Sequence, residues 1–270
     1  MDQPTASSQP YPWRLFWLLL IAAIVSALSI VPIASDMRGA MITQLELPKI
    51  PLLLLLAVGI VQNLAILALI VGFGLKLSRS LGLRAPLLES WADRAEVNAQ
   101  SDSRVRKILT LGLLVGIGVG IVLLISLLLL APRLPNLPFV IVARLPVWKR
   151  LLACFYGGIY EELLTRLFLL SLVAWIANRS WRKSAPELSN SAFWFANILV
   201  AILFGLGHLP SASLFLPITP LVVTAALLLN GVAGIAFGCL YRRQGLEAAM
   251  IAHFTGDFVI YVVGPVLLKH

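Results

Sequence analysis

Two adjacent acids and a base interrupt an otherwise apolar stretch of the chain, and their types and spacing are suited to chemistry. Glu161 and Glu162 are followed by Arg166 inside a segment that runs from about residue 151 to residue 177. On a helix, Glu162 and Arg166 stand at positions i and i+4 with the acid first, the favourable order for an ion pair. Glu161 then points about 100° away around the helix axis. We therefore expect Arg166 to neutralise and position Glu162, and Glu161 to face a different partner.

The same segment is long enough to cross a bilayer, which takes about 20 apolar residues. Three charged groups near the centre of a membrane helix cost about 8–10 kcal/mol, whereas the large apolar side chains of the segment return only about 4–8 kcal/mol. The segment therefore needs an internal ion pair and polar partners on other helices. A purely structural ion pair would explain Glu162 and Arg166, but it would leave Glu161 without a role.

Two histidines lie inside later apolar segments, and each has a polar or aromatic neighbour one helical turn away. Phe204 precedes His208 by four residues, and Asp257 follows His253 by four residues. A single histidine on an apolar helix face is usually structural. Here, however, the two histidines, the aspartate and the Glu-Glu-Arg group make up nearly all the buried ionisable groups of this half of the chain. Polar groups in hydrocarbon need partners, so we expect these side chains to converge.

This set of side chains suits hydrolysis by an activated water molecule. A carboxylate and a neutral imidazole can together hold a water and take its proton, and a second histidine with its neighbour can donate to a developing oxyanion. No nucleophile is evident: the sequence has no Gly-x-Ser-x-Gly, no His-Glu-x-x-His, and no histidine or lysine close to the span serines Ser26, Ser29, Ser126 and Ser171. Two histidines and one glutamate could also ligate zinc, and this alternative stays open.

The composition is that of an integral membrane protein. Of the 270 residues, 60% are hydrophobic and 12% are charged, against about 25% charged in a typical soluble domain. Cys154 and Cys239 lie in apolar segments, and we interpret them as small buried hydrophobes. The net charge of +9 sits mostly in loops, where it is a topology signal and meets the headgroups of the lipid bilayer. Nucleic acid is therefore excluded as a partner.

The apolar segments predict an all-α, polytopic bundle of about seven to eight transmembrane helices. Seven spans are expected at about 14–34, 51–75, 108–130, 151–177, 191–209, 219–241 and 246–267. Residues 131–150 predict an interfacial or re-entrant piece, with an eighth segment at 134–148 as the alternative, and residues 87–97 could form a surface helix. Gly112, Gly116 and Gly120 recur every four residues and predict a smooth stripe for close helix packing.

Domain organisation and orientation follow from the same pattern. We expect residues 1–130 to be a generic transmembrane region of about three spans and residues 131–270 to be the functional core. With seven spans, most of the flanking basic residues fall on the N-terminal side, so the positive-inside rule predicts a cytoplasmic N-terminus. The short, loop-poor chain favours a multi-pass protein of the bacterial plasma membrane.

The polar groups resemble the motifs of the CPBP family of intramembrane proteases, also called the CAAX protease and bacteriocin-processing or Abi family. The family's motifs are Glu-Glu-x-x-x-Arg, Phe-x-x-x-His and His-x-x-x-Asn or Asp, and all three occur here in that order within about 100 residues. Each motif alone is weak, whereas three in order, each in an apolar span, are specific. The resemblance covers about residues 148–265.

The resemblance implies an all-α intramembrane glutamic endopeptidase of a family often labelled as metalloproteases. The family's site positions correspond to Glu161, Glu162, Arg166, His208, His253 and Asp257. By carry-over, the first glutamate and the first histidine would activate water, the second glutamate and the arginine would support that geometry, and the last two residues would form the oxyanion pocket. Prenyl-processing members carry Asn at the last position, whereas Asp257 can donate a hydrogen bond only when protonated. The resemblance implies no metal and no other cofactor.

The expected function is therefore an endopeptidase that cleaves a membrane-embedded or lipidated peptide, with a prenylated CAAX-type substrate as one possibility. A non-catalytic membrane immunity or scaffold protein of the same fold is an alternative, against which the complete motifs argue. A proton-coupled transporter is less favoured, because the amino-terminal half has no matching polar residues and hence no sign of an inverted repeat. The substrate and the oligomeric state do not follow from the sequence.

Overall fold

The computed structural model describes residues 11–35, 52–94, 99–134, 136–181 and 187–267, without the side chains of 52–61, 99 and 100. Every regular element in these ranges is a helix. This is expected of apolar segments, because a helix satisfies its backbone hydrogen bonds internally where no water is present. The predicted all-α membrane fold is confirmed. The predicted tail before residue 11, most of the predicted loop at 35–50 and His270 lie outside the described residues.

The helices follow one another along the chain with short connections. In order they are α1 (Trp13–Ser29), α3 (Leu52–Ser80), α4 (Pro86–Ala92), α5 (Ala99–Leu130), α6 (Pro138–Ala143), α7 (Val147–Phe155), η1 (Tyr156–Glu161), η2 (Leu163–Leu170), α8 (Ser171–Trp181), α9 (Asn190–Gly207), α10 (Leu209–Ser213), α11 (Pro220–Gln244), α12 (Leu246–Asp257), η3 (Phe258–Val263) and α13 (Gly264–Leu267). The elements η1, η2 and η3 are π-helical, so their backbone hydrogen bonds run from i to i+5.

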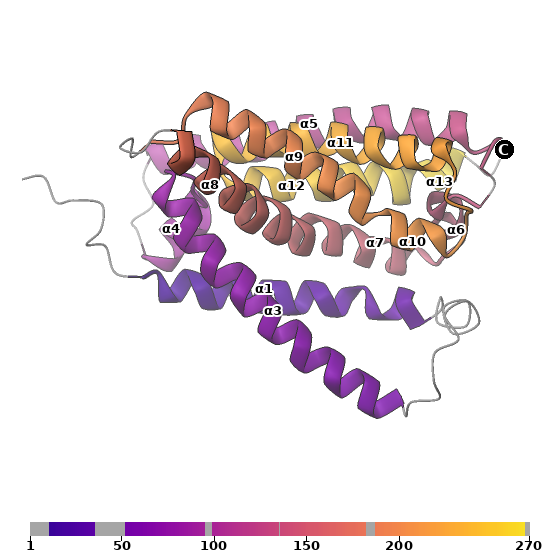
Figure 1. The fold of residues 1–270 in the computed structure, drawn as a ribbon, viewed down its shortest axis with the longest axis horizontal. Helices are drawn as coiled ribbons and strands as arrows, with labels where there is room; N and C mark the ends of the chain where they lie inside the picture. The colour runs from indigo at the N-terminus through magenta and orange to yellow at the C-terminus, as the bar shows by residue number, and fades with distance from the viewer. Residues whose placement is uncertain (1–10, 36–51, 95–98, 135, 182–186, 268–270) are drawn as a thin grey trace, which may run out of the picture.

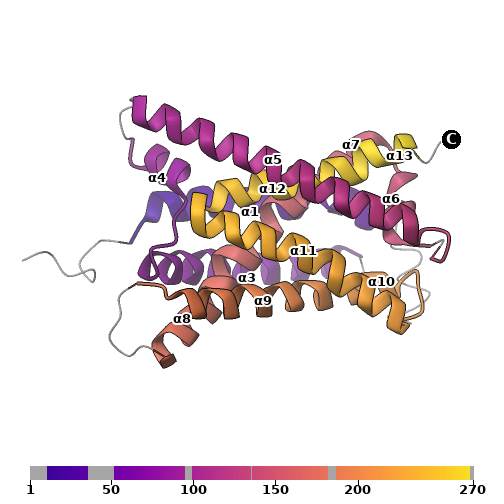
Figure 2. The same cartoon turned by 90° about the horizontal axis from the view of Figure 1, so that it is seen from above.

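The long helices form a bundle in which one helix occupies a central position (Figure 1). Elements α7, η1, η2 and α8 run without a break from Val147 to Trp181. This continuous helix, which we call the charged helix, contacts α1 and α3 on one side and α9, α11 and α12 on the other. Figure 2 shows α12 lying between α5 and α11. The charged helix therefore meets both the amino-terminal pair of helices and the carboxy-terminal ones.

Six helices in the described part of the chain are long and apolar enough to cross a membrane. They are Trp13–Ser35, Gln62–Ser80, Ser101–Leu130, Asn190–Ser213, Pro220–Gln244 and Leu246–Leu267, and they correspond to six of the seven predicted spans. The remaining predicted span, 151–177, lies within the charged helix, which is not among the six. The predicted number of seven to eight spans is therefore not confirmed.

Two shorter segments were predicted near the membrane surface. The surface helix predicted at 87–97 corresponds to α4 (Pro86–Ala92), which ends earlier than expected. In the 134–148 region the structure has α6 (Pro138–Ala143), a helix of six residues that is only about 9 Å long at 1.5 Å per residue. Because α6 is too short to cross a bilayer, it does not add an eighth span.

The glycine stripe of α5 allows α12 to approach its backbone closely. A Cβ atom added at Gly116 would lie 2.5 Å from the carbonyl oxygen of Ala252, and one at Gly120 would lie 2.9 Å from that of Gly256. Gly112 is equally crowded, with neighbouring atoms at 2.9 Å. A larger residue at these positions would push the two helices apart. The predicted packing role of the stripe is confirmed, and it sets the distance at which α12 stands from α5.

Candidate functional site

The charged helix contains the predicted internal ion pair. Nη1 of Arg166 lies 3.1 Å from Oε1 of Glu162, and both side chains are buried. Nη2 of Arg166 donates to the backbone carbonyl of Gly234 on α11 at 3.1 Å, and Nη1 also donates to the hydroxyl of Thr165. Breaking a buried ion pair leaves an uncompensated charge and is strongly destabilising, so these partners explain how Arg166 tolerates complete burial.

Aromatic rings enclose the Arg166 guanidinium on its other sides. Its central carbon lies 5.5 Å from the ring centre of Phe204 and 5.7 Å from that of Phe237, a distance at which a ring face attracts a cation. The same two rings pack on His253, with centres 6.0 Å and 5.1 Å from the imidazole. The two phenylalanines therefore form one wall shared by the arginine and the histidine.

His253 of α12 is oriented by Glu162 of the charged helix. Its Nδ1 lies 2.6 Å from Oε1 of Glu162, so an Nδ1–H group donates to the carboxylate. Nε2 then faces the two other acids, at 3.6 Å from Oε2 of Glu161 and 3.8 Å from Oδ2 of Asp257. These two distances are longer than a hydrogen bond but within reach of an ion pair. The predicted convergence of the Glu-Glu-Arg group with the His253 pair is confirmed.

The adjacent glutamates have different surroundings. The Glu162 side chain is fully buried, and its Oε1 is shared between Arg166 and His253. Oε2 of Glu162 has no hydrogen-bond partner among the described residues. The Glu161 side chain, in contrast, is 20% exposed. Glu162 therefore holds the cluster together, while Glu161 is the more exposed of the two carboxylates.

His208 lies at the carboxy-terminal end of α9, and its ring is held by its own helix. Its Nδ1 is 2.8 Å from the carbonyl oxygen of Phe204, so Nδ1 carries a proton and donates it to that oxygen. The Phe204 ring packs edge-on against His208 at 4.6 Å and also against His253. Both histidines therefore contact the same phenyl ring. No polar contact in the described part of the chain joins His208 to Glu161, so their cooperation stays a prediction.

The backbone around the acids is wider than an α-helix. Element η1 ends at Glu161, η2 begins at Leu163, and η3 begins directly after Asp257. Isolated π-helical turns occur frequently at functional sites. The sequence analysis assumed regular α-helical geometry and missed this feature, because nothing in the spacing of apolar residues marks an i to i+5 hydrogen bond.

A serine of α1 inserts its hydroxyl into the charged helix just before the acids. Oγ of Ser26 donates to the carbonyl of Phe155 at 3.0 Å and accepts from the N–H of Tyr160 at 3.2 Å. These two backbone groups are five residues apart, so the hydroxyl stands between the partners of one π-helical turn. Ser29 donates to the carbonyl of Leu152 at 3.0 Å. Neither serine was predicted to have a role beyond its failure as a nucleophile. The expectation that the charged helix needs polar partners on other helices was the one signal that could have identified them.

The glycine pair at the centre of η1 makes room for α12. A Cβ atom at Gly157 would overlap Oδ2 of Asp257 and would lie 3.1 Å from Nε2 of His253. A Cβ atom at Gly158 would lie 2.8 Å from that of Phe254. The Gly-Gly dipeptide, which precedes Glu161 by two intervening residues, is a sequence signal that could have indicated this close approach of α12.

A comparison with protein-family models places these residues in a known context. Residues 143–259 match the family described as type II CAAX prenyl endopeptidase Rce1-like. This segment is a domain of the CAAX protease family. The match begins just before α7 and ends within η3, so it includes all three motifs, and the resemblance inferred from the motifs is confirmed. Comparisons with curated proteins and with solved structures gave no match.

The CAAX protease domain receives a contribution from outside the matched segment. Ser26 and Ser29 of α1 hydrogen-bond to the charged helix, although α1 precedes the match by more than 100 residues. The division into residues 1–130 and 131–270 stays a prediction. The contacts show, however, that the first helix takes part in shaping the site of the second region.

The potential for metal binding in the CAAX protease domain depends on which side chains come together. No group of three or more His, Cys, Asp or Glu side chains in the described residues is arranged to hold a metal ion. In the set considered for zinc, His208 and His253 both pack against the ring of Phe204. Cys154 and Cys239 are both free; the predicted burial is confirmed for Cys154, whereas Cys239 is only half-buried. The expectation of a metal-free site stays a prediction.

Proposed function

We propose that the protein is an intramembrane endopeptidase that hydrolyses a peptide bond of a membrane-embedded or lipidated substrate, with prenylated CAAX-type peptides in this class. The observation that carries the proposal is the pair of adjacent glutamates with opposite exposure. Glu162 is buried and holds His253, whereas Glu161 is more exposed and lies 3.6 Å from the same imidazole. One acid is thus structural and the other is available for chemistry, as acid–base catalysis requires.

In the proposed reaction, Glu161 takes a proton from a water molecule whose oxygen attacks the carbonyl carbon of the scissile bond. Nε2 of His208 assists in holding this water. The tetrahedral intermediate collapses when the C–N bond breaks, and the proton taken by Glu161 passes to the leaving nitrogen. The products are a carboxylic acid and an amine, so no covalent enzyme intermediate is needed.

His253 and Asp257 stabilise the charge that develops on the carbonyl oxygen. The five ionisable side chains have no net charge when Glu161 and Glu162 are ionised, Arg166 and His253 are positive, and Asp257 carries a proton. In this state Nε2 of His253 and the carboxyl group of Asp257 are both hydrogen-bond donors, which is what an oxyanion requires. The proton on Asp257 gives it the donor capacity that Asn supplies in the prenyl-processing members.

Cleavage of defined peptides by the purified full-length protein in liposomes tests this function. A panel of quenched transmembrane and prenylated peptides is compared for the wild type, Glu161→Ala and, as a matched control, Glu187→Gln, which changes an exposed acid of a loop. We expect the wild type and Glu187→Gln to cleave at equal rates and Glu161→Ala to be inactive. Equal cleavage by all three proteins would refute the proposal.

The same assay in EDTA, and again after addition of zinc, tests the metal-free mechanism. Activity that persists in EDTA supports water activation by Glu161. Activity that is lost in EDTA and restored by zinc would instead make Glu161, His208 and His253 metal ligands.

A further inference from the structure

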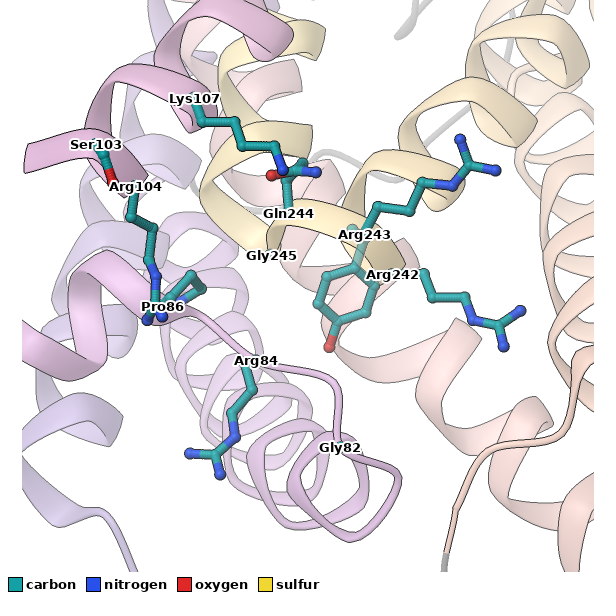
Figure 3. A pocket seen from close by; sticks show the side chains of 11 residues that line it. Gly82, Arg84, Pro86, Ser103, Arg104, Lys107, Arg242, Arg243, Gln244 and Gly245 are labelled. Carbon is teal, nitrogen blue, oxygen red and sulfur yellow. The ribbon is translucent and has the colours of Figure 1, made fainter. Parts of the chain in front are cut away.

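A hollow lined by basic side chains lies at the end of the bundle where α3 ends and α12 begins. It has a volume of about 500 Å³, within the range of small-molecule sites. Its charged lining comes from three segments of the chain, and these residues are Arg84, Arg104, Lys107, Arg242 and Arg243. None of the described residues that line the hollow is acidic. Figure 3 shows Arg104 extending toward Pro86 and Lys107 toward Gln244, with the two adjacent arginines of α11 on the other side.

Most of this positive charge has no protein partner. Arg84 pairs with Glu89 at 3.2 Å, and Arg242 donates to the side chain of Asn190 at 2.7 Å. Arg104, Lys107 and Arg243 form no ion pair with any described residue, and all three are exposed. The set therefore retains three unpaired cations around one hollow.

Glu247, a buried acid two residues after Gly245, is not among the described residues that line the hollow. Oε1 of Glu247, in the first turn of α12, accepts the backbone N–H groups of Leu87 and Leu88 at 2.9 and 2.8 Å. It thereby satisfies the amino-terminal turn of α4. A second hollow at the same end offers a contrast, because its lining combines Arg14 and Arg79 with two acids.

The position of the basic hollow limits what can enter it. Four candidate membrane spans begin or end beside it, at Ser80, Ser101, Gln244 and Leu246. The hollow is therefore at the boundary between hydrocarbon and water, the level at which lipid phosphates lie. Basic pockets between transmembrane helices at this level are suited to anionic headgroups.

We propose that this hollow binds the phosphate group of an anionic phospholipid headgroup. Arg104 and Lys107 of α5 reach it from one side, and Arg243 of α11 completes the ring of charge. Guanidinium and ammonium groups supply charge-assisted hydrogen bonds to phosphate oxygens. Exposed charges at the mouth are screened by salt, so binding weakens as ionic strength rises.

Isothermal titration of the full-length protein in neutral detergent tests the site. The probes are dioctanoyl phosphatidylglycerol, dioctanoyl phosphatidylcholine and inorganic phosphate. We expect the phosphatidylglycerol Kd to rise about fivefold in Arg104→Gln and in Lys107→Gln, and about 25-fold in the double variant, from the interaction of each basic side chain with an anionic surface. Phosphatidylcholine and inorganic phosphate should bind at least tenfold more weakly than phosphatidylglycerol.

The matched control is Arg106→Gln, because Arg106 is exposed on the same helix between the two test residues but does not line the hollow. Its Kd should change less than twofold. An equal loss in Arg106→Gln would show general surface charge instead of a site, and equal binding of inorganic phosphate would show a soluble anion as the ligand. Failure of phosphatidylglycerol to bind the wild type would refute the proposal. None of these outcomes depends on peptidase activity.

Discussion

The protein carries two groups of charge that differ in almost every physical respect. The cluster around Glu162 lies inside the bundle, and its members are paired across the charged helix, α11 and α12. The basic hollow lies at the ends of the helices, where Arg104, Lys107 and Arg243 are exposed and unpaired among the described residues. The charges of the cluster are paired with other protein groups, whereas the three cations at the hollow are available to an external anion.

The difference determines how each group responds to change. In the cluster, loss of one member strands its partner in a low-dielectric interior, where the cost is several kcal/mol. At the hollow, water hydrates whatever remains, so each loss is small and nearly additive. The effects of substitutions on stability should therefore be strongly non-additive within the cluster and nearly additive at the hollow. Substitutions in each group test that contrast.

Replacing Glu161 by Gln should reduce kcat/KM by about 10²–10⁴, the usual contribution of a general base. Because this side chain is the exposed acid of the cluster, the unfolding transition should move little. Peptide cleavage and thermal unfolding in detergent measure the two quantities on one sample. Activity within tenfold of the wild type would remove Glu161 from the chemistry.

Replacing Arg166 by Met should destabilise the protein by about 3–5 kcal/mol, because the buried Glu162 carboxylate loses its arginine partner and retains only His253. Equilibrium unfolding in mixed micelles measures this loss. The double variant Glu162→Leu/Arg166→Met removes both charges and should recover a substantial part of the stability, although not the activity. A double variant no more stable than Arg166→Met would attribute the loss to packing against the two phenylalanines.

Replacing Ser26 by Ala should lower kcat about tenfold with little change in KM, because Glu161 at the end of η1 is displaced from its position. A tenfold loss in kcat raises the activation free energy by about 1.4 kcal/mol. The loss of stability should be about 1–3 kcal/mol, because a backbone N–H and a carbonyl lose their partner. Ser126→Ala is the control, since the Ser126 hydroxyl bonds only within its own helix, to the carbonyl of Val122. A change in KM alone would contradict the positioning role.

Replacing Asp257 by Asn should keep kcat within about tenfold of the wild type, because the amide still donates to an oxyanion, whereas Asp257→Ala should lose about 10²–10³. Steady-state kinetics on one substrate compares the two variants. Equal losses in both would indicate that the carboxyl group acts as a proton carrier and not as a donor.

The smallest effect is expected at the hollow. Lys107→Gln should change the free energy of unfolding by less than about 0.5 kcal/mol, the usual range for an exposed position. Unfolding in neutral detergent without added lipid is the measurement. A loss comparable to that of Arg166→Met would show that the hollow is part of the folded core, and the contrast between the two groups would fail.

Much of the site could be predicted because polar groups in hydrocarbon have few ways to be satisfied. The Glu162–Arg166 pair followed from helical spacing, and the approach of His253 followed from the need for partners. The glycine stripe of α5 likewise predicted close packing, although not that α12 would be the helix packed there. The membrane-spanning character of six helices followed directly from their apolar length.

Other features depend on backbone detail that leaves little trace in the pattern of residue types. The π-helical turns η1 and η2 require particular backbone hydrogen bonds, and an apolar run looks the same with or without them. The insertion of Ser26 depends on how α1 is rotated against the charged helix. The orientation of His208 toward the carbonyl of Phe204 is set by the end of α9.

The sharing of Glu162 between two cations has a consequence for the order of events during synthesis. Arg166 is made almost together with Glu162, but His253 follows 91 residues later. At about 5–20 residues per second, the ribosome takes roughly 5–20 s to deliver it. During this interval the charged helix has its internal pair and the hydroxyls of α1, which is already present, but not the imidazole. In a nascent chain released before α12, the charged helix should therefore be only half neutralised. Membrane quality control should recognise such a chain by this helix.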